Sequence, residues 1–227
     1  MSFKTYIKFI LSFPKTFYVN FKVFSLMQAC KLPILVDYRT KLSGLHRGCI
    51  QIDEKIRPFM IKFGFQEGTL GVPQIVTDNY LIFGKTGKAV FYGKAQFARG
   101  ISLRIDSGTI SFGRNFSCNK CCFIACNCEI TFGNDVLIGW HTNIRDMDGH
   151  NVWLGEKIDS CLHNVERPIK IGNNVWIASY VDILKGSEIP DGCIVAYRSC
   201  VYKKFEQEKC IIGGYPARIV KENILWE

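Results

Sequence analysis

The chain has 227 residues, of which 48% are hydrophobic and 22% are charged, and its formal net charge is +9. This length and apolar content suffice for one sizeable core, and the mixed charges exclude a long disordered segment. The positive balance favours an anionic partner, a class that includes nucleic acid, membrane surfaces and phosphate-bearing cofactors. Eleven cysteines, an odd number, without a signal sequence predict a reducing, cytoplasmic compartment rather than a disulfide framework.

Aromatic residues recur at spacings of three and four between Phe3 and Phe24, which predicts an amphipathic helix. Lysines interrupt this run too often for a membrane-spanning segment of about 20 apolar residues. Two arrangements stay open for the aromatic face. We favour its packing against the main body, and the alternative is docking of residues 1–28 on a membrane surface.

A period of six residues dominates the C-terminal half of the chain. The aliphatic series is Ile171, Ile177, Ile183, Ile189, Val195 and Val201, and the small or β-branched series is Val175, Val181, Ser187, Cys193 and Ser199. A helix would place residues six apart on separate faces, and a flat strand would require the alternate positions too. A coil with three six-residue sides satisfies the pattern, which predicts a parallel β-helix.

The same period extends upstream with short insertions. Its members there are Phe91, Phe97, Leu103, Phe112, Cys118, Ile124, Phe132, Ile138 and Ile144. We therefore predict an all-β chain with a helical or capping segment at residues 1–44, a β-helix at 45–204 and a C-terminal tail at 205–227. The period disappears after Ile144, which predicts a loop over residues 145–170 extruded from one corner.

The cysteine cluster CNKCCFIACNC at residues 118–128 has the C-x-x-C spacing of zinc sites, but a zinc site needs a second pair of ligands. In the six-residue frame Cys118 takes an aliphatic position, and Cys122 and Cys128 take small positions. Free cysteine behaves as a small hydrophobic residue. We therefore expect these thiols in the core, and we expect no metal.

Several ordered motifs between residues 90 and 221 resemble those of the hexapeptide-repeat acetyltransferases, particularly the sugar and polysaccharide O-acetyltransferases related to maltose and galactoside acetyltransferases. The motifs are NKCCFI at 119–124, FGNDVLIGW at 132–140, DMDGH at 146–150, RPIKIGNNVWIAS at 167–179 and GGYPARIVK at 213–221. The resemblance implies a left-handed β-helix and acetyl-CoA as co-substrate. It also implies acetylation of a sugar hydroxyl in surface-polysaccharide or glycan biosynthesis, by a homotrimer with active sites between subunits.

The resemblance also assigns catalytic residues within these motifs. His150 corresponds to the general base that takes the proton from the acceptor hydroxyl. Imidazole suits this role because its ordinary pKa of about 6.5 leaves a neutral base near pH 7. Asn119 corresponds to an asparagine at the acceptor site, and either Asp146 or Asp148 would orient the imidazole.

The resemblance places coenzyme A along one side of the solenoid. The corresponding residues are Ala178, Ser179, Tyr197, Lys203, Arg218 and Lys221. The first three would border the pantetheine arm, with backbone N–H groups near Ala178 and Ser179 stabilising the oxyanion. The three cations would face the nucleotide phosphates. Many relatives have glycine in place of Ala178, so the thioester is slightly more crowded here.

Other interpretations of the sequence stay open. The same base would serve N-acetylation of an amino sugar, and a β-helix without catalysis would act as a scaffold or binding module. His141 and His163 are expected to be structural or surface residues, and with His150 they do not resemble the zinc ligands of β-helix carbonic anhydrases. No nucleic-acid-binding motif is recognisable. We expect a cytoplasmic protein, at the inner membrane face if residues 1–28 contact lipid.

Overall fold

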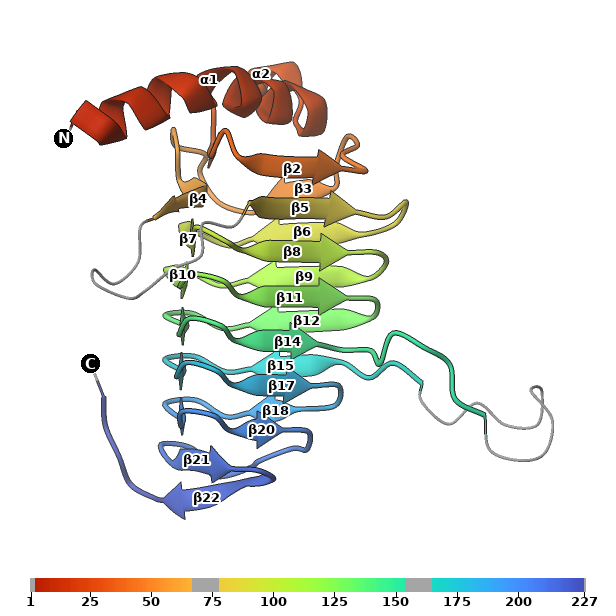
Figure 1. Ribbon diagram of the computed structural model, residues 1–227, viewed down its shortest axis with the longest axis vertical. Coiled ribbons are helices and arrows are strands. Elements are labelled where there is room, and N and C mark those ends of the chain that lie inside the picture. Colours follow the sequence, from red (N-terminus) through yellow and green to blue (C-terminus); the bar gives the residue numbers. More distant parts are fainter. Residues whose placement is uncertain (1–2, 67–77, 154–164, 227) are drawn as a thin grey trace.

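The computed structural model describes residues 3–66, 78–153 and 165–226. Within these ranges the chain is a left-handed parallel β-helix with a helix lying across its N-terminal end (Figure 1). The predicted all-β solenoid is confirmed. Its three sides are sheets A, B and C. From β1 to β20 each strand pairs with the strand three positions away along the chain, because one complete coil separates them.

The described part of sheet A contains β1 (Ile34–Val36), β4 (Ile61–Gln66), β7 (Ala95–Ala98), β10 (Phe116–Cys118), β13 (Leu137–Ile138), β16 (Trp176–Ile177), β19 (Ile194–Val195), β21 (Ile211–Gly214) and β22 (Ala217–Lys221). Sheet B contains β2 (Thr40–Ser43), β5 (Asn79–Phe83), β8 (Ser102–Ile105), β11 (Phe123–Cys126), β14 (Asn143–Arg145), β17 (Asp182–Leu184) and β20 (Cys200–Val201). Sheet C contains β3 (Ile50–Ile52), β6 (Lys88–Phe91), β9 (Thr109–Phe112), β12 (Glu129–Phe132), β15 (Ile169–Ile171) and β18 (Glu188–Ile189).

The six-residue period sets the register of these sheets. On sheet A the aligned residues are Cys118, Ile138, Ile177 and Val195; on sheet B they are Ile124, Ile144, Ile183 and Val201; on sheet C they are Phe112, Phe132, Ile171 and Ile189. None of these side chains is more than 2% exposed. Each aliphatic position of the repeat therefore points into the prism and stacks on its equivalent in the next coil.

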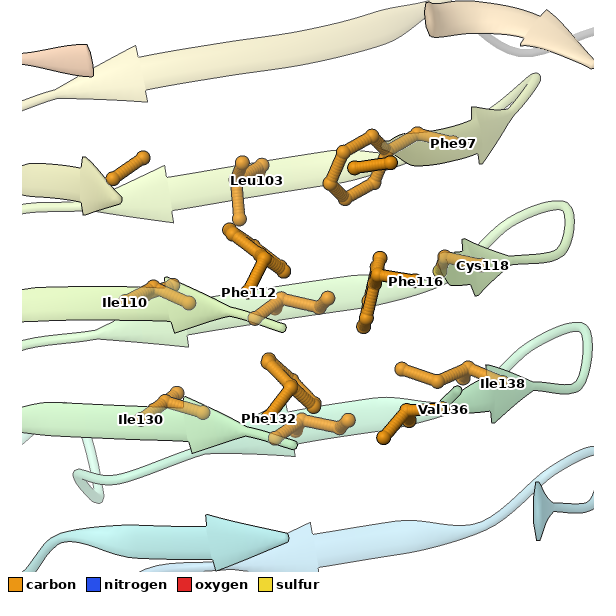
Figure 2. Packing of buried hydrophobic residues seen from close by; sticks show 14 of the residues in the cluster. Phe97, Leu103, Ile110, Phe112, Phe116, Cys118, Ile130, Phe132, Val136 and Ile138 are labelled. Atoms are coloured by element: carbon orange, nitrogen blue, oxygen red, sulfur yellow. The ribbon is translucent and has the colours of Figure 1, made fainter. Parts of the chain in front are cut away.

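Phenylalanine fills the prism in its N-terminal half (Figure 2). Phe112 stacks between Phe91 and Phe132, with ring centroids 4.8 and 5.4 Å away, and Phe116 approaches Phe112 edge-on at 4.7 Å. Aromatic rings favour these offset and edge-on arrangements. The large rings occupy the coils whose repeat is interrupted by insertions, whereas isoleucine and valine suffice where the six-residue period is regular.

The cysteine prediction is confirmed at two positions and corrected at a third. Cys118 and Cys122 are 0% and 1% exposed in the core. Cys128 is only half-buried, because it lies at the corner between sheets B and C where its backbone N–H turns toward Asp146. All ten cysteines within the described ranges are free thiols.

Helix α1 (Phe3–Val23) confirms the predicted helix, but the face that it presents to the solenoid is largely polar rather than aromatic. Phe13 and Phe17 are 42% and 48% exposed, whereas the buried positions include Ser12, Thr16 and Asn20, each at 0%. The short helix α2 (Leu26–Ala29) follows. The favoured prediction of an inward aromatic face is therefore confirmed only in part. Phe9 and Phe21 are half-buried, with the Phe9 ring 5.7 Å from the Phe59 ring, and Phe24, just beyond the end of α1, is buried at 3%.

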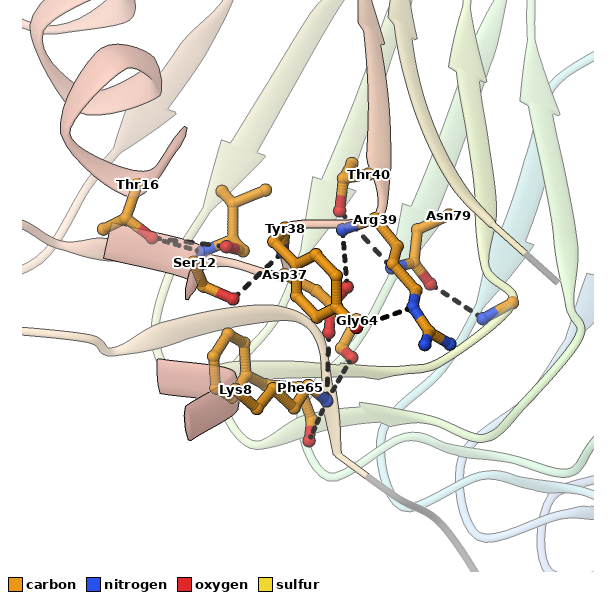
Figure 3. Close-up of polar contacts among 12 residues, drawn as sticks. Lys8, Ser12, Thr16, Asp37, Tyr38, Arg39, Thr40, Gly64, Phe65 and Asn79 are labelled. Atoms are coloured by element: carbon orange, nitrogen blue, oxygen red, sulfur yellow. Dashed lines mark hydrogen bonds and ion pairs between the residues drawn. The ribbon is translucent and has the colours of Figure 1, made fainter. Parts of the chain in front are cut away.

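The reason for this orientation is the exposed edge of β1, the first strand of sheet A (Figure 3). Asn20 accepts from the Ile34 N–H at 3.1 Å and donates to the Ile34 carbonyl at 2.7 Å. Thr16 accepts from the Val36 N–H at 3.0 Å and donates to the Val36 carbonyl at 3.3 Å. The polar residues, spaced by four, thus satisfy a strand edge that would otherwise lack partners.

The solenoid extends beyond the predicted boundaries of 45–204. It begins with β1 at Ile34, and β21 still pairs in parallel with β19 before β22 turns back antiparallel. The sequence hides this first coil because its edge is covered by polar residues of α1 rather than by another coil. The predicted loop leaves the solenoid after Arg145 and returns before Ile169, and beyond the buried Asp146 its described part projects away from the prism (Figure 1).

Candidate functional site

The described part of the extruded loop begins at the corner between sheets B and C. Strands β8, β11 and β14 reach this corner in successive coils, so the residues after them lie one above another. Asp106 follows β8, Asn127 follows β11 and Asp146 follows β14. Polar side chains from three coils are therefore collected at the base of the loop.

Asp146 anchors the loop and is completely buried. Its carboxylate accepts hydrogen bonds from the backbone N–H groups of Asn127 and Cys128, both at 2.8 Å, and the Cys126 thiol donates to it at 3.3 Å. The Arg167 N–H donates to the Asp146 carbonyl at 3.2 Å, so both stems of the loop meet here. Both carboxylate oxygens of Asp146 are thus engaged by the preceding coil, which gives this residue a structural role.

Beyond Asp146 the loop forms one wall of a polar pocket with a volume of about 260 Å³. Its lining residues are Arg104, Asp106, Asn127, Met147, Asp148, Gly149, His150, Asn151 and Glu166. His150 is exposed, and Asp148, which lines the same pocket, accepts from Lys185 Nζ at 2.7 Å. The pocket thus combines an imidazole with hydrogen-bonding groups suited to a polyhydroxylated ligand.

Arg104 on β8 and Asp106, which follows this strand, also line the pocket. Arg104 Nε donates to both carboxylate oxygens of Asp106, at 2.9 and 2.7 Å, which orients the exposed guanidinium group. Sequence reasoning missed these two residues and Asn127. A signal was available, because their coils precede the loop and end at the same corner in the six-residue frame.

Asn119 lies at a different corner from His150. It follows β10 at the corner between sheets A and B, where it is half-buried and its N–H donates to the Ile138 carbonyl at 2.9 Å. One side of the prism, on the order of 15 Å, separates the two corners. Within one chain the structure does not bring Asn119 and His150 together.

The residues expected beside the pantetheine arm also lie at the corner between sheets A and B. Ala178 and Ser179 follow β16, and Tyr197 follows β19 one coil further on. Coils approach closely here, because a Cβ on Gly139 would lie only 2.6 Å from the Ser179 nitrogen. Ser179 is buried at 6%, whereas Tyr197 is 55% exposed. These three residues, which were expected to border coenzyme A, therefore share one corner with Asn119.

The backbone N–H of Ala178 is not available for an oxyanion, because it donates to the Val195 carbonyl at 2.9 Å within the ladder. The expectation of an oxyanion donor at Ala178 is therefore corrected. The N–H of Ser179 makes no hydrogen bond within the described ranges, so it is the remaining candidate for the oxyanion donor at this corner.

Tyr180, Arg198 and His141 complete the surface of this corner and were not assigned to a site from the sequence. The His141 ring stacks on Tyr180 with centroids 4.8 Å apart, and the Arg198 guanidinium lies 5.8 Å from the Tyr180 ring and 5.4 Å from the Tyr197 ring. Tyr180 and Arg198 are 18 residues apart, which is one full coil of three six-residue sides. His163 lies outside the described residues.

The three expected phosphate-binding cations are all exposed but are not clustered within one chain. Arg218 on β22 pairs with Gly213, which lies next to Ala196 and so near the corner of Tyr197. Lys221 lies at the other end of β22, opposite Ile211. Lys203 follows β20 at the corner between sheets B and C, with its ammonium group 5.2 Å from the Phe205 ring.

The buried thiols near the site are held in their neutral form. Burial raises the pKa of Cys126, and the adjacent Asp146 carboxylate raises it further. Burial likewise raises the pKa of Cys118 well above its ordinary value. Because the thiolate is the reactive form, neither residue is suited to act as a nucleophile.

Comparison with known proteins identifies the family of this chain. It is 31% identical over 144 residues to the Escherichia coli K12 protein named "Putative lipopolysaccharide biosynthesis O-acetyl transferase WbbJ", and the match spans 58% of this chain and 73% of that protein. The chain belongs to the hexapeptide-repeat acetyltransferases. It is also 33% identical over 113 residues to the galactoside O-acetyltransferase of Escherichia coli K12, spanning 50% of this chain and 54% of that acetyltransferase.

The fold agrees with this membership in the acetyltransferase family. The crystal structure of the polySia-specific acetyltransferase NeuO superposes with a TM-score of 0.57 and 21% sequence identity, covering 86% of this chain and 77% of that chain. No protein-family model matches the sequence. The resemblance that the ordered motifs indicated is therefore confirmed by relatives and by the fold.

Proposed function

We propose that the protein is an acetyl-CoA-dependent O-acetyltransferase that acetylates a sugar hydroxyl in surface-polysaccharide or glycan biosynthesis. The observation that carries this proposal is the position of His150 in a polar pocket, in a chain related to O-acetyltransferases. Both relatives are named for transfer to oxygen, which favours a hydroxyl over an amine as the acceptor.

In the proposed reaction the neutral His150 imidazole accepts the proton of the sugar hydroxyl while the hydroxyl oxygen attacks the thioester carbonyl. A tetrahedral oxyanion forms, for which the Ser179 N–H is the proposed donor. The intermediate then collapses, the carbon–sulfur bond breaks, and the imidazolium returns its proton to the leaving thiolate. The products are the acetyl ester and coenzyme A, so no covalent acetyl-enzyme is needed.

We assign binding of the sugar acceptor to Asn119 and His150 together. We assign binding of acetyl-CoA, the acetyl donor, to the corner that carries Tyr197. The Asn119 amide would bind a sugar hydroxyl, and Asp148 would support the imidazole from the same loop. Arg218, Lys203 and Lys221 would bind the phosphates of coenzyme A as cations. The positive balance of the chain suits such a polyanionic co-substrate.

The separation of Asn119 from His150 supports a homotrimer. The two residues occupy different corners of one prism. They can bind the same acceptor only if the Asn119 corner of one subunit faces the His150 corner of a neighbouring subunit. A threefold arrangement supplies three identical heterologous contacts of this kind and closes on itself. We further place the enzyme in the cytoplasm, where acetyl-CoA is made and where free thiols persist.

The first experiment compares acetyl-CoA binding and transfer in the wild type and in His150→Ala. Binding is measured by calorimetry, and transfer is measured from radiolabelled acetyl-CoA to a panel of galactosides and sialic acid oligomers. We expect turnover to fall by roughly two to four orders of magnitude while acetyl-CoA affinity stays unchanged. His46→Ala, which changes a histidine between β2 and β3 and outside this pocket, is the matched control and should keep full turnover. Intact turnover in His150→Ala would exclude the proposed base.

A second experiment tests whether one active site draws on two subunits. Asn119→Ala and His150→Ala are each inactive by this proposal, so the two variants are co-expressed with different tags and the mixed oligomers are purified. If the site is shared, each purified trimer that contains both variants has one intact site, so about a third of the sites of the wild-type trimer are restored. If both residues served the same site from one chain, mixing would restore no activity and the intersubunit site would be excluded.

A further inference from the structure

Helices α1 and α2 form a cap on the N-terminal end of the solenoid. The outward face of this N-terminal cap is apolar over its described length. Its residues are Tyr6, Ile7, Ile10, Leu11, Phe13, Phe17, Tyr18, Leu26 and Met27, and each is at least 41% exposed. At 100° per residue the members on α1 fall within an arc of roughly 160°. An exposed apolar surface of this extent on a folded protein indicates a binding partner.

This face cannot turn inward, because the opposite face of α1 is fully engaged. Thr16 and Asn20 are hydrogen-bonded to β1 as described above, and Ser12 accepts from the Tyr38 N–H, two residues beyond β1, at 3.0 Å. Lys8 Nζ donates to the carbonyls of Gly64 at 3.0 Å and Phe65 at 3.3 Å, and it lies 3.1 Å from Asp37 Oδ2 (Figure 3). Rotating the helix would leave these buried polar groups without partners.

The charges of the cap are uniformly positive. Residues 1–36 contain five lysines and no aspartate or glutamate. Lys15 is occupied, since it donates to the carbonyls of Tyr38 and Thr40 at 2.6 Å, and burial lowers its pKa. Lys22 and Lys31, at the C-terminal end of the cap, are exposed. The surroundings of the apolar face are therefore suited to an anionic partner.

We propose that this face binds the surface of an anionic lipid bilayer. Helix α1 lies across the end of the solenoid, so its apolar face points away from the protein and can lie flat on a membrane plane (Figure 1). Aromatic and aliphatic side chains would enter the boundary between headgroups and acyl chains, while Lys22 and Lys31 contact lipid phosphates. No helix within the described ranges is long and apolar enough to cross a bilayer, which fits a helix that lies in the interface.

A second copy of the chain is the competing occupant, and the charges disfavour it. A face-to-face contact between two copies would be isologous, so each copy would present the same uncompensated lysines to the other. With no acidic residue among residues 1–36, such a contact lacks the opposite charge that a lipid surface supplies.

The test is flotation of the full-length protein with vesicles of phosphatidylethanolamine and phosphatidylglycerol, compared with vesicles of phosphatidylcholine alone. We expect the wild type to float with the anionic vesicles and to bind the neutral ones much more weakly. The assay contains no acetyl-CoA and measures no transfer, so its result is independent of the proposed enzymatic function.

Two sets of variants separate the apolar contribution from the charges. Combining Ile10→Ser, Leu11→Ser and Phe17→Ser should lower partitioning by at least about 100-fold, whereas Tyr80→Ser, Tyr92→Ser and Leu225→Ser, which remove exposed apolar side chains elsewhere, should not change it. Lys22→Glu with Lys31→Glu should lower binding to anionic vesicles by roughly 30-fold or more. Lys85→Glu with Lys88→Glu makes the same change in net charge away from the cap and should have little effect.

Sedimentation of the protein without lipid completes the test. If the wild type fails to float and instead forms a larger oligomer that the triple serine variant dissociates, a second copy covers the face and the membrane proposal is overturned. Equal flotation of the wild type and the triple variant would also overturn it. As a check that does not depend on lost binding, Phe17→Trp should show a blue-shifted tryptophan emission when anionic vesicles are added.

Discussion

The polar residues beneath α1 and those around His150 both interrupt the apolar pattern, but the first set is buried and the second is exposed. Beneath α1, Lys8 and Asp37 are 7% and 0% exposed and pair with one another and with backbone groups. Around His150, the imidazole is exposed and Asp148 is 46% exposed, in a pocket built from several coils. Similar residue types thus hold the fold together in one region and face a ligand space in the other.

This difference separates structural polar groups from candidate functional ones. Buried charges persist only where partners compensate for their desolvation, so complete pairing is the mark of a structural cluster. Groups that bind a ligand must instead keep some capacity for hydrogen bonding and must be reachable. By this criterion Asp146 is a structural residue, although it stands in the loop that carries His150. Asp37, Asp146 and Asp148 therefore provide a direct test of the distinction.

The largest effect on stability is expected at Asp37. Asp37→Ala leaves Lys8 buried without its counter-charge and should lower the free energy of unfolding by about 3–5 kcal/mol, measured by urea denaturation. Asp78→Ala is the control, because its ion pair with Lys41 is exposed and should contribute less than about 1 kcal/mol. Equal stability of the two variants would remove the structural role assigned to the cluster beneath α1.

A smaller loss is expected at Asp146. Asp146→Ala strands the N–H groups of Asn127 and Cys128 and should lower the free energy of unfolding by roughly 2–4 kcal/mol. Asp146→Asn keeps one acceptor oxygen and should lose less. Turnover should also fall because the base of the loop shifts, while acetyl-CoA affinity stays constant. A variant with wild-type stability but impaired turnover would instead place Asp146 in direct contact with the reacting groups.

The smallest change in stability is expected at Asp148. Its ion pair with Lys185 is partly exposed, so Asp148→Ala should change the free energy of unfolding by less than about 1 kcal/mol. If Asp148 supports His150, turnover should fall by roughly tenfold, and Lys185→Ala serves as a comparison that removes the ion pair but keeps the carboxylate. Unchanged turnover in Asp148→Ala would exclude Asp148 as the residue that supports His150.

Much of the solenoid could be predicted from single positions in the sequence. The register of Ile138, Ile177 and Val195 on sheet A follows directly from the six-residue count, and so does the burial of Cys118. The loop after Ile144 was visible as a gap in the same count. The count also places the coil of Arg104 and Asp106 at the corner where the loop leaves, but their hydrogen bonds and their place in the pocket of His150 were not visible, because the count places backbone positions and not side-chain contacts.

The sequence by itself determined the repeating coil, its inward-facing residues and the place where the loop leaves it, since each repeat has the same local geometry. Tertiary structure alone decided which face of α1 is buried, because that choice depends on an edge strand whose N–H and C=O groups need partners. It also decided that Asn119 and His150 stand at different corners and that Asp146 is an anchor. These outcomes depend on how coils stack in space, and hydrogen bonds between distant residues outweigh the apolar periodicity of a single helix.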